Sequence, residues 1–293
     1  MNKKNSRLGV VFLVLEIIIS FALASFVKKL QPEFSVFTIL FFRYLFCLPL
    51  LISFGFFYLG RSFLNIQNIR ILILRIIFGF LGLLFWFLAV SIIDISLATV
   101  LAQTMPIFII VFSVLIAREK VGVESFGAVL LGFIGVLVLS FPLTPESNLL
   151  GIFFALSGAL FAALMFVFLR ILGRSDSAVS SAIWYNVAGL ICSGFIIFLS
   201  DEISVIYTAM DINDFMLFAG FGFLASFQQF FLAQSHSYAK ASTLAPFHYL
   251  SIPIGITTGI LFFNEIITLK FVIGTLIIAY SSYSILVKEQ SRH

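Results

Sequence analysis

Long apolar runs separated by short polar segments make up almost the whole chain. A bilayer core of about 30 Å needs about 20 apolar residues per helix, so this pattern predicts membrane-spanning helices. Strands of a membrane barrel would be about ten residues long with alternating polarity, which this sequence lacks. We therefore predict an all-α integral membrane protein with ten spans, at residues 8–30, 34–59, 69–90, 95–117, 124–141, 149–170, 178–200, 213–236, 241–263 and 268–287.

The composition agrees with this prediction. Of the 293 residues, 61% are hydrophobic and only 10% are charged, and the mean hydropathy is +1.18. Soluble chains carry about 25% charged residues. The first run follows a basic start, but it is too long for a signal peptide and lacks a small-residue cleavage site, so it is expected to be an uncleaved span. Cys47 and Cys192 both fall within spans, which suggests neither a disulfide framework nor a metal cluster; no cofactor is expected.

The basic residues are distributed unevenly between the two ends of the spans. With a cytoplasmic N-terminus, only Lys28, Lys29 and Lys270 lie at outer ends. The positive-inside rule then favours cytoplasmic N- and C-termini, in a bacterial inner membrane. The net charge of +4 reflects this asymmetry and does not call for nucleic acid as a partner. The basic residues at the inner ends are Lys3, Lys4, Arg7, Arg61, Arg70, Arg118, Lys120, Arg170, Arg174, Lys240, Lys288 and Arg292.

The two halves of the chain resemble one another. LAVSIIDISLATVLAQTMPIF at 88–108 and LAQSHSYAKASTLAPFHYLSI at 232–252 share an order of features: a closing span, a short polar link, a small-residue segment and a proline. We therefore predict two five-helix repeats, residues 1–144 and 145–293. Because five is an odd number of crossings, the second repeat must be inverted relative to the first. Inverted repeats are typical of secondary transporters, with a site at the interface between repeats.

These features resemble the EamA-type ten-helix members of the drug/metabolite transporter superfamily. The resemblance covers nearly the full chain. It is carried by FFRYLF around Arg43, by the block at 85–139, and by its echo at 243–280. In the family each half has a proline in its fourth span and a closing glutamate. Pro106 with Glu119 matches this pattern in the first half, and Pro246 or Pro253 with Glu265 matches it in the second.

Within that superfamily the chain looks closest to the subgroup that contains S-adenosylmethionine uptake carriers. LRIIFGFLG at 74–82 and APFHYL at 245–250 carry this likeness. Those carriers tend to have an arginine in an A-P-Y-R-Y run, where this chain has His248. Riboflavin importers and amino-acid exporters of the same group therefore stay as alternatives.

Ionisable residues near the bilayer centre are expensive and therefore mark functional hypotheses. Glu16 and Arg43 lie about 12 and 13 Å from the ends of the first and second spans, at 1.5 Å per residue. They could form a fixed internal ion pair, or grip the charged groups of a zwitterionic substrate, and Glu16 could carry a coupling proton. Arg75 lies near a span end and is expected to extend to the membrane surface. Glu119 and Glu265 are expected to be interface-exposed caps or hinges.

Further candidates for a substrate site are aromatic and amide side chains, which can stack on or hydrogen-bond a polar ligand. With 39 phenylalanines, an aromatic residue here is more often packing than site. His248 could titrate near neutral pH, or be a neutral, hydrogen-bonded histidine. Spans one, three, four, six, eight and nine are expected to line a central cavity, with spans five and ten outside it. The candidates besides Glu16 and Arg43 are Trp86, Gln103, Trp184, Tyr185, Asn186, Gln228, Gln229, His248 and Tyr249.

No catalytic motif competes with a transport function. G-x-S-x-G, H-E-x-x-H and a phosphate loop are absent, and the three histidines are not spaced as metal ligands. We predict a secondary active carrier that moves a small polar metabolite across a bacterial inner membrane by alternating access. Its expected partners are the substrate, the surrounding membrane lipids and protons as a candidate coupling ion, and a homodimer is a candidate assembly. A lipid flippase and an intramembrane enzyme built on Glu16 and His248 are the alternatives of other classes.

The segment LAPFHYLSIPIG at 244–255 is the least regular part of any predicted span. Its two prolines remove backbone donors and free carbonyls that a helix interior would normally pair. Membrane helices tolerate such breaks only where protein or a cavity covers them. The counterpart in the first half, LAQTMPIF at 101–108, has a proline but no histidine.

Overall fold

A computed structural model describes helices joined by short turns and irregular connections. The described residues are 6–30, 33–90, 92–93, 98, 101–140, 148–200, 202–254 and 269–291. The longer helices are α1 (Ser6–Leu30), α2 (Val36–Leu59), α3 (Ile69–Val90), α5 (Met105–Leu115), α6 (Val123–Ser140), α7 (Leu149–Leu172), α8 (Ala178–Leu199), α10 (Ile212–Tyr238) and α13 (Leu269–Ser291). The short elements are η1 (Gly60–Ser62), α9 (Glu202–Ala209), α11 (Ala241–Leu244) and η2 (Ala245–Leu250).

Eight of the predicted spans agree closely with these helices. The fourth and ninth, at 95–117 and 241–263, are only partly described: the first contains α5, and the second begins with α11 and η2. Five described helices, α2, α3, α7, α8 and α10, are long and apolar enough to cross a membrane. Many large apolar side chains are exposed, which suits contact with lipid, for example Phe57, Phe198, Met216 and Leu276.

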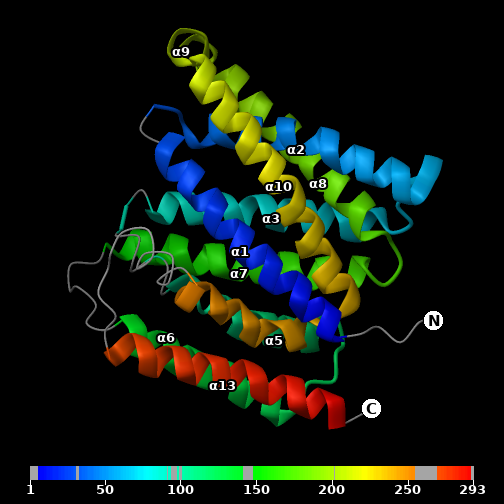
Figure 1. Ribbon diagram of the computed structural model, residues 1–293, viewed down its shortest axis with the longest axis vertical. Coiled ribbons are helices and arrows are strands. Elements are labelled where there is room, and N and C mark those ends of the chain that lie inside the picture. Colours follow the sequence, from blue (N-terminus) through cyan, green and yellow to red (C-terminus); the bar gives the residue numbers. More distant parts are fainter. Residues whose placement is uncertain are drawn as a thin grey trace.

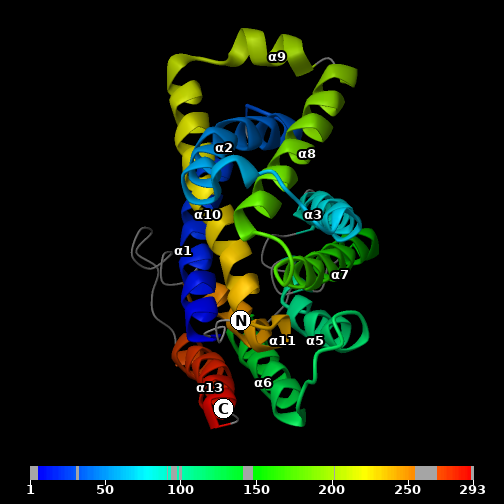
Figure 2. The same cartoon turned by 90° about the vertical axis from the view of Figure 1, so that its right-hand side faces the viewer.

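The long helices pack in pairs that join the two halves of the chain. α3 lies against α7, α1 against α10, α2 against α8, and α6 against α13. Figure 1 shows α6 and α13 together at one end of the molecule and α9 at the other. In Figure 2, α9 connects the ends of α8 and α10. Figure 1 also places the start of α1 and the end of α13 on the same side.

The backbones of α3 and α7 approach each other closely at two glycines. A Cβ atom on Gly82 would lie 3.0 Å from the backbone nitrogen of Ala162, and one on Gly158 would lie 3.1 Å from that of Trp86. Small residues of this kind let membrane helices touch through their backbones, where dispersion contacts replace a missing hydrophobic driving force. No side chain larger than hydrogen fits at either position unless the two helices separate.

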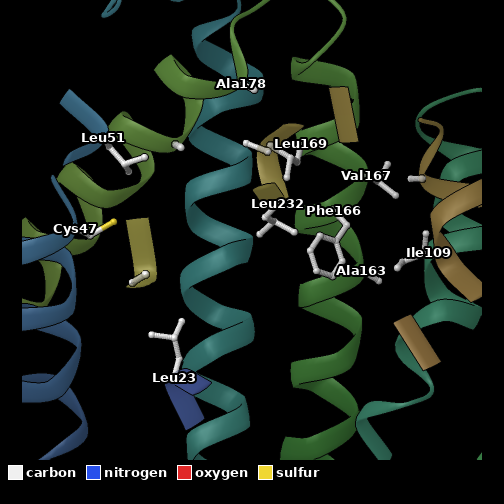
Figure 3. Packing of buried hydrophobic residues seen from close by; sticks show 14 of the residues in the cluster. Leu23, Cys47, Leu51, Ile109, Ala163, Phe166, Val167, Leu169, Ala178 and Leu232 are labelled. Atoms are coloured by element: carbon white, nitrogen blue, oxygen red, sulfur yellow. The ribbon is translucent and has the colours of Figure 1, made fainter. Parts of the chain in front are cut away.

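The apolar core extends between the helix pairs. Figure 3 shows part of it, where Cys47 of α2, Leu232 of α10 and Phe166 of α7 face the interior together with Ile109 of α5. The helices that enclose this core begin at polar residues. Ser35 accepts a hydrogen bond from the Thr38 N–H (3.2 Å) at the start of α2.

Asp211 begins α10 in a capping box with Asp214. The hydrogen bond that Asp211 accepts from the Asp214 N–H (2.7 Å) lowers the pKa of Asp211. The sequence does not predict the preceding helix, α9, which fell in a polar connection. Glu202 at its start accepts hydrogen bonds from the hydroxyls of Ser35 and Thr38, the latter at 2.9 Å.

Candidate functional site

A buried polar network joins the middle of α1, α2 and α10. Arg43 on α2 donates a hydrogen bond from Nη2 to Oε1 of Gln228 on α10 (3.0 Å). The Nε2 group of Gln228 donates to Oε1 of Glu16 on α1 (2.7 Å). Ser20, one turn after Glu16, donates to the same carboxylate oxygen (2.7 Å), and Gln229 donates to the Gln228 oxygen (3.1 Å). Glu16 and Arg43 are each less than a tenth exposed.

The amide of Gln228 separates the two charges of this network. Both Glu16 and Arg43 belong to the described part of the chain, and no direct ion pair joins them there. Only one orientation of the amide satisfies both neighbours, with its NH₂ towards the carboxylate and its oxygen towards the guanidinium. The adjacent-span pair predicted from sequence is therefore bridged by a residue from a third helix.

Aromatic rings continue the network from α2 to α8 and α3. Tyr44, next to Arg43, packs edge-on against Tyr185 of α8, with ring centroids 6.1 Å apart. The guanidinium of Arg75 on α3 lies 4.9 Å from the Tyr185 ring centroid. Arg75 also donates from Nη1 to the carbonyl of Ser181 and to its Oγ atom, the latter at 2.7 Å.

The expectation that Arg75 extends to the membrane surface is wrong. Its side chain is 1% exposed and lies between α3 and α8. The error has a simple cause, because depth along a helix does not reveal which face a residue occupies. Arg75 occupies the face of α3 that α8 covers, so its guanidinium meets Ser181 and Tyr185 instead of water.

Two glycines leave room for the tyrosine pair. A Cβ atom on Gly189 would lie 2.5 Å from two ring atoms of Tyr44, and one on Gly79 would lie 2.7 Å from the ring of Tyr185. Real Cβ atoms do not approach other atoms so closely, and Tyr44 is fully buried and has no free space to move into. The two glycines therefore help to fix the tyrosine positions.

Gly189→Ala is expected to destabilise the protein by about 1–3 kcal/mol, because overpacking displaces Tyr44. Gly127→Ala is the matched control, since no atom lies within 4 Å of a Cβ atom added there. That change should be neutral or stabilising by up to about 1 kcal/mol, as alanine favours a helix. The free energy of unfolding in detergent measures both. Equal effects of the two substitutions would contradict the packing described for Tyr44.

A second cluster surrounds His248 in the 3₁₀ helix η2. The ring of Phe166 stacks on His248 at 4.8 Å and on His236 of α10 at 5.0 Å, measured between centroids, and the two histidine rings are 6.3 Å apart. His236, the last residue of the predicted eighth span, was considered only as a metal ligand and was not among the predicted site residues. Its Nδ1 lies 3.0 Å from Ser235 Oγ, while Nε2 of both histidines has no hydrogen-bond partner among the described residues.

The other predicted candidates are distributed over several places. Tyr249 is fully buried beside Gly132, and no described residue hydrogen-bonds its hydroxyl. Gln103 donates to Ser251 Oγ (3.4 Å), which joins the α5 region to the helical residues after η2. Asn186, also fully buried, donates to the carbonyl of Ala182 one turn earlier in α8 (2.7 Å).

The two tryptophans lie apart from the polar network. Trp184 is 37% exposed, and its indole donates to the carbonyl of Leu64 in the connection between α2 and α3 (2.9 Å). Trp86 packs against the small apolar cluster that contains Ala89 and Ala155, between α3 and α7.

Glu119, at the end of the α5 region, is buried and not interface-exposed as expected. Its carboxylate lies 3.4 Å from Nε of Arg170 and 3.7 Å from Nη2 of Arg174. It also accepts hydrogen bonds from the N–H (3.2 Å) and hydroxyl (2.8 Å) of Ser242. The end of the span is covered by α7 and α11, which explains its burial. Glu265, expected to have a similar place, lies outside the described residues.

A comparison with protein families identifies the family to which this chain belongs. The model of the EamA-like transporter family matches residues 7–141 and again residues 149–287. The chain belongs to the EamA-like transporter family. Together with its apolar helices, this makes it a multi-pass membrane protein of a transporter family, and the family resemblance predicted from sequence is confirmed.

Several curated proteins are similar to this chain over most of their length. An S-adenosylmethionine uptake transporter of Rickettsia prowazekii is 26% identical over 90% of this chain and 87% of its own. The human protein named solute carrier family 35 member G1 is 28% identical over 88% of this chain and 73% of its own. A riboflavin transporter of Vibrio cholerae is 25% identical over 75% and 72%, respectively.

A solved crystal structure has the same fold as this EamA-like chain. It superposes with a TM-score of 0.81 over 97% of this chain and 98% of its own, at 14% sequence identity. At that identity the likeness concerns the fold alone.

Proposed function

We propose that this protein is a secondary active carrier that moves a small polar metabolite across a bacterial inner membrane by alternating access. The observation that carries this proposal is the buried network of Glu16, Gln228 and Arg43. Charges are costly inside a membrane domain and are retained there mainly for function. S-adenosylmethionine is the first substrate to test, because one relative is named an S-adenosylmethionine uptake transporter. Amino acids and vitamins such as riboflavin come next.

The Gln228 bridge supports a charged or zwitterionic substrate. An amide between a carboxylate and a guanidinium can be displaced at either end by a substrate group of the matching charge. An ammonium or sulfonium would then approach Glu16. A direct ion pair would have to be broken first, at a higher cost, because each buried charge would lose its partner.

The helix pairing supports the inverted repeats 1–144 and 145–293. We number the spans from one to five within each half. The third span of the first half (α3) then packs on the first span of the second half (α7), and the first span of the first half (α1) packs on the third span of the second half (α10). The second spans pair with each other (α2 with α8), as do the fifth (α6 with α13). This pattern is unchanged when the halves are exchanged, as expected for two repeats related by a two-fold axis.

We further propose ten spans with cytoplasmic N- and C-termini. An even number of crossings agrees with the start of α1 and the end of α13 lying on the same side (Figure 1). The concentration of arginines and lysines at that side agrees with a cytoplasmic orientation. α6 and α13, at one end of the molecule, would then be scaffold outside the transport path.

Transport in sealed vesicles tests the proposed function. Vesicles that contain the purified protein should accumulate at least one labelled probe among S-adenosylmethionine, amino acids and riboflavin. Comparison with and without an imposed pH gradient decides whether protons are the coupling ion. Protein-free vesicles are the control. If no probe accumulates, while labelled lipid changes leaflet or a probe is chemically altered in detergent, a flippase or an enzyme replaces this proposal.

A further inference from the structure

Arg75 is a buried cation for which the structure provides no negative charge. Its side chain is 1% exposed, and no carboxylate among the described residues forms an ion pair with it. The side chains that lie against it are those of Ser181 and Tyr185. A buried charge without a counter-charge is expensive, and in a membrane protein it points to a ligand.

Contacts to one nitrogen of this guanidinium and to the Tyr185 ring hold it in one orientation. Nη1 donates both to the carbonyl and to the hydroxyl of Ser181. The face of the guanidinium lies against the ring of Tyr185 at 4.9 Å, and Gly79 gives that ring its space. A planar cation anchored at one nitrogen and one face cannot rotate freely, so the direction of its remaining N–H groups is fixed.

The remaining edge of the guanidinium is unused. Among the described residues, Nε is buried without a hydrogen-bond partner, and both hydrogen bonds of the guanidinium come from Nη1 and none from Nη2. The N–H groups of Nε and Nη2 are parallel, and together they form the fork that matches the two oxygens of a carboxylate. A residue whose only role was to fasten α3 to α8 would not need this fork, because Nη1 alone makes the connection to Ser181.

We propose that the Nε–Nη2 edge of Arg75 binds the carboxylate of the transported solute. This inference rests on the proposed function and makes it more specific, since it assigns a carboxylate-bearing zwitterion as the substrate class. A continuous series of contacts runs from Arg75 through Tyr185, Tyr44, Arg43 and Gln228 to Glu16. Arg75 provides a positive charge at one end of this series, and Glu16 provides a negative charge at the other.

Binding of two matched probes to purified protein tests the assignment. S-adenosylmethionine carries the carboxylate, and decarboxylated S-adenosylmethionine differs by lacking it. L-Methionine and its carboxamide form a second pair. The wild type should bind the carboxylate member of a pair about 10- to 100-fold more tightly, as expected for a charge-assisted bidentate contact. Equal affinity for both members of each pair overturns the inference without any variant.

Variants then assign the preference to Arg75. Arg75→Gln should lower the affinity for the carboxylate probe to that of its partner and leave the affinity for the partner unchanged. Arg75→Lys keeps the charge but not the two parallel N–H groups, so it should retain only part of the carboxylate preference. This variant replaces Arg75→Gln in the test if the glutamine variant does not fold. Arg70→Gln, at an exposed position one turn earlier in sequence, is the matched control and should change neither affinity.

The outcomes separate this inference from the proposed function. A full carboxylate preference in both Arg75 variants overturns the role of Arg75 and leaves the carrier intact. If wild-type vesicles take up both members of a pair at equal rates, the role of Arg75 is again overturned and the carrier function stands. If vesicles accumulate no probe and the purified protein binds none, the proposed function fails, and the inference fails with it.

Discussion

Glu16→Gln is expected to lower the initial rate of uptake by about 10- to 100-fold while the protein stays folded. The amide oxygen of glutamine can still accept the hydrogen bonds from Ser20 and Gln228, so the network keeps its shape. What is lost is the negative charge at the middle of α1, which is the part that a cationic group of the substrate would use. Uptake of whichever probe the wild type accumulates fastest measures the effect.

Glu33→Gln provides the control for this experiment. This variant carries the same substitution, glutamate to glutamine, at an exposed position beyond the end of α1. Its replacement should leave uptake within about twofold, in keeping with the small effects of most surface changes. Wild-type uptake by Glu16→Gln, with an unchanged response to a pH gradient, would remove Glu16 from both the substrate site and any proton pathway.

Glu119→Ala is expected to destabilise the protein by about 3–5 kcal/mol, because it leaves a buried charge uncompensated. Arg170 is 11% exposed at its side chain and would lose its carboxylate, although it would still donate to the carbonyls of His236 (3.0 Å) and Ser237 (3.2 Å). Ser242 would lose the acceptor for both its N–H and its hydroxyl. The free energy of unfolding in detergent measures the loss.

The two arginines around Glu119 give an internal comparison. Arg174 is 46% exposed at its side chain, so Arg174→Ala should cost about 1 kcal/mol or less. Arg170→Ala should cost several times more, since it leaves the Glu119 carboxylate buried beside a weaker partner. The double replacement Glu119→Leu with Arg170→Met should recover part of the loss, because it removes both charges together. Equal costs for the two arginines would contradict the burial of this cluster.

The helices could be predicted because lipid imposes their length and composition directly. The polar centre of the site could be predicted in part for the same reason: Glu16, Arg43 and Gln228 stand out within apolar runs. Their arrangement could not, because Gln228 lies far along the chain and reaches Glu16 only when α10 packs on α1. A hairpin of neighbouring spans suggested a simpler pair than the one that exists.

Arg75 and Glu119 show where a linear reading fails. Both lie near the ends of predicted spans, and a position near an end suggests contact with water. In the fold, another helix covers each end: α8 lies over Arg75, and α7 with α11 lies over Glu119. The 3₁₀ helix η2 likewise depends on Pro246 and on the packing around His248. The sequence shows the proline but not the packing.

The glycine contact between α3 and α7 has a consequence for any rocking motion of the two proposed repeats. α3 comes from the first half of the chain and α7 from the second, and their backbones approach closely at Gly82 and Gly158. Helices in such contact can tilt about the point where they meet, but they cannot slide past it or separate there without losing their packing. This contact, like that of Gly222 in α10 with the backbone of Phe46 in α2, would therefore be a pivot of such a motion.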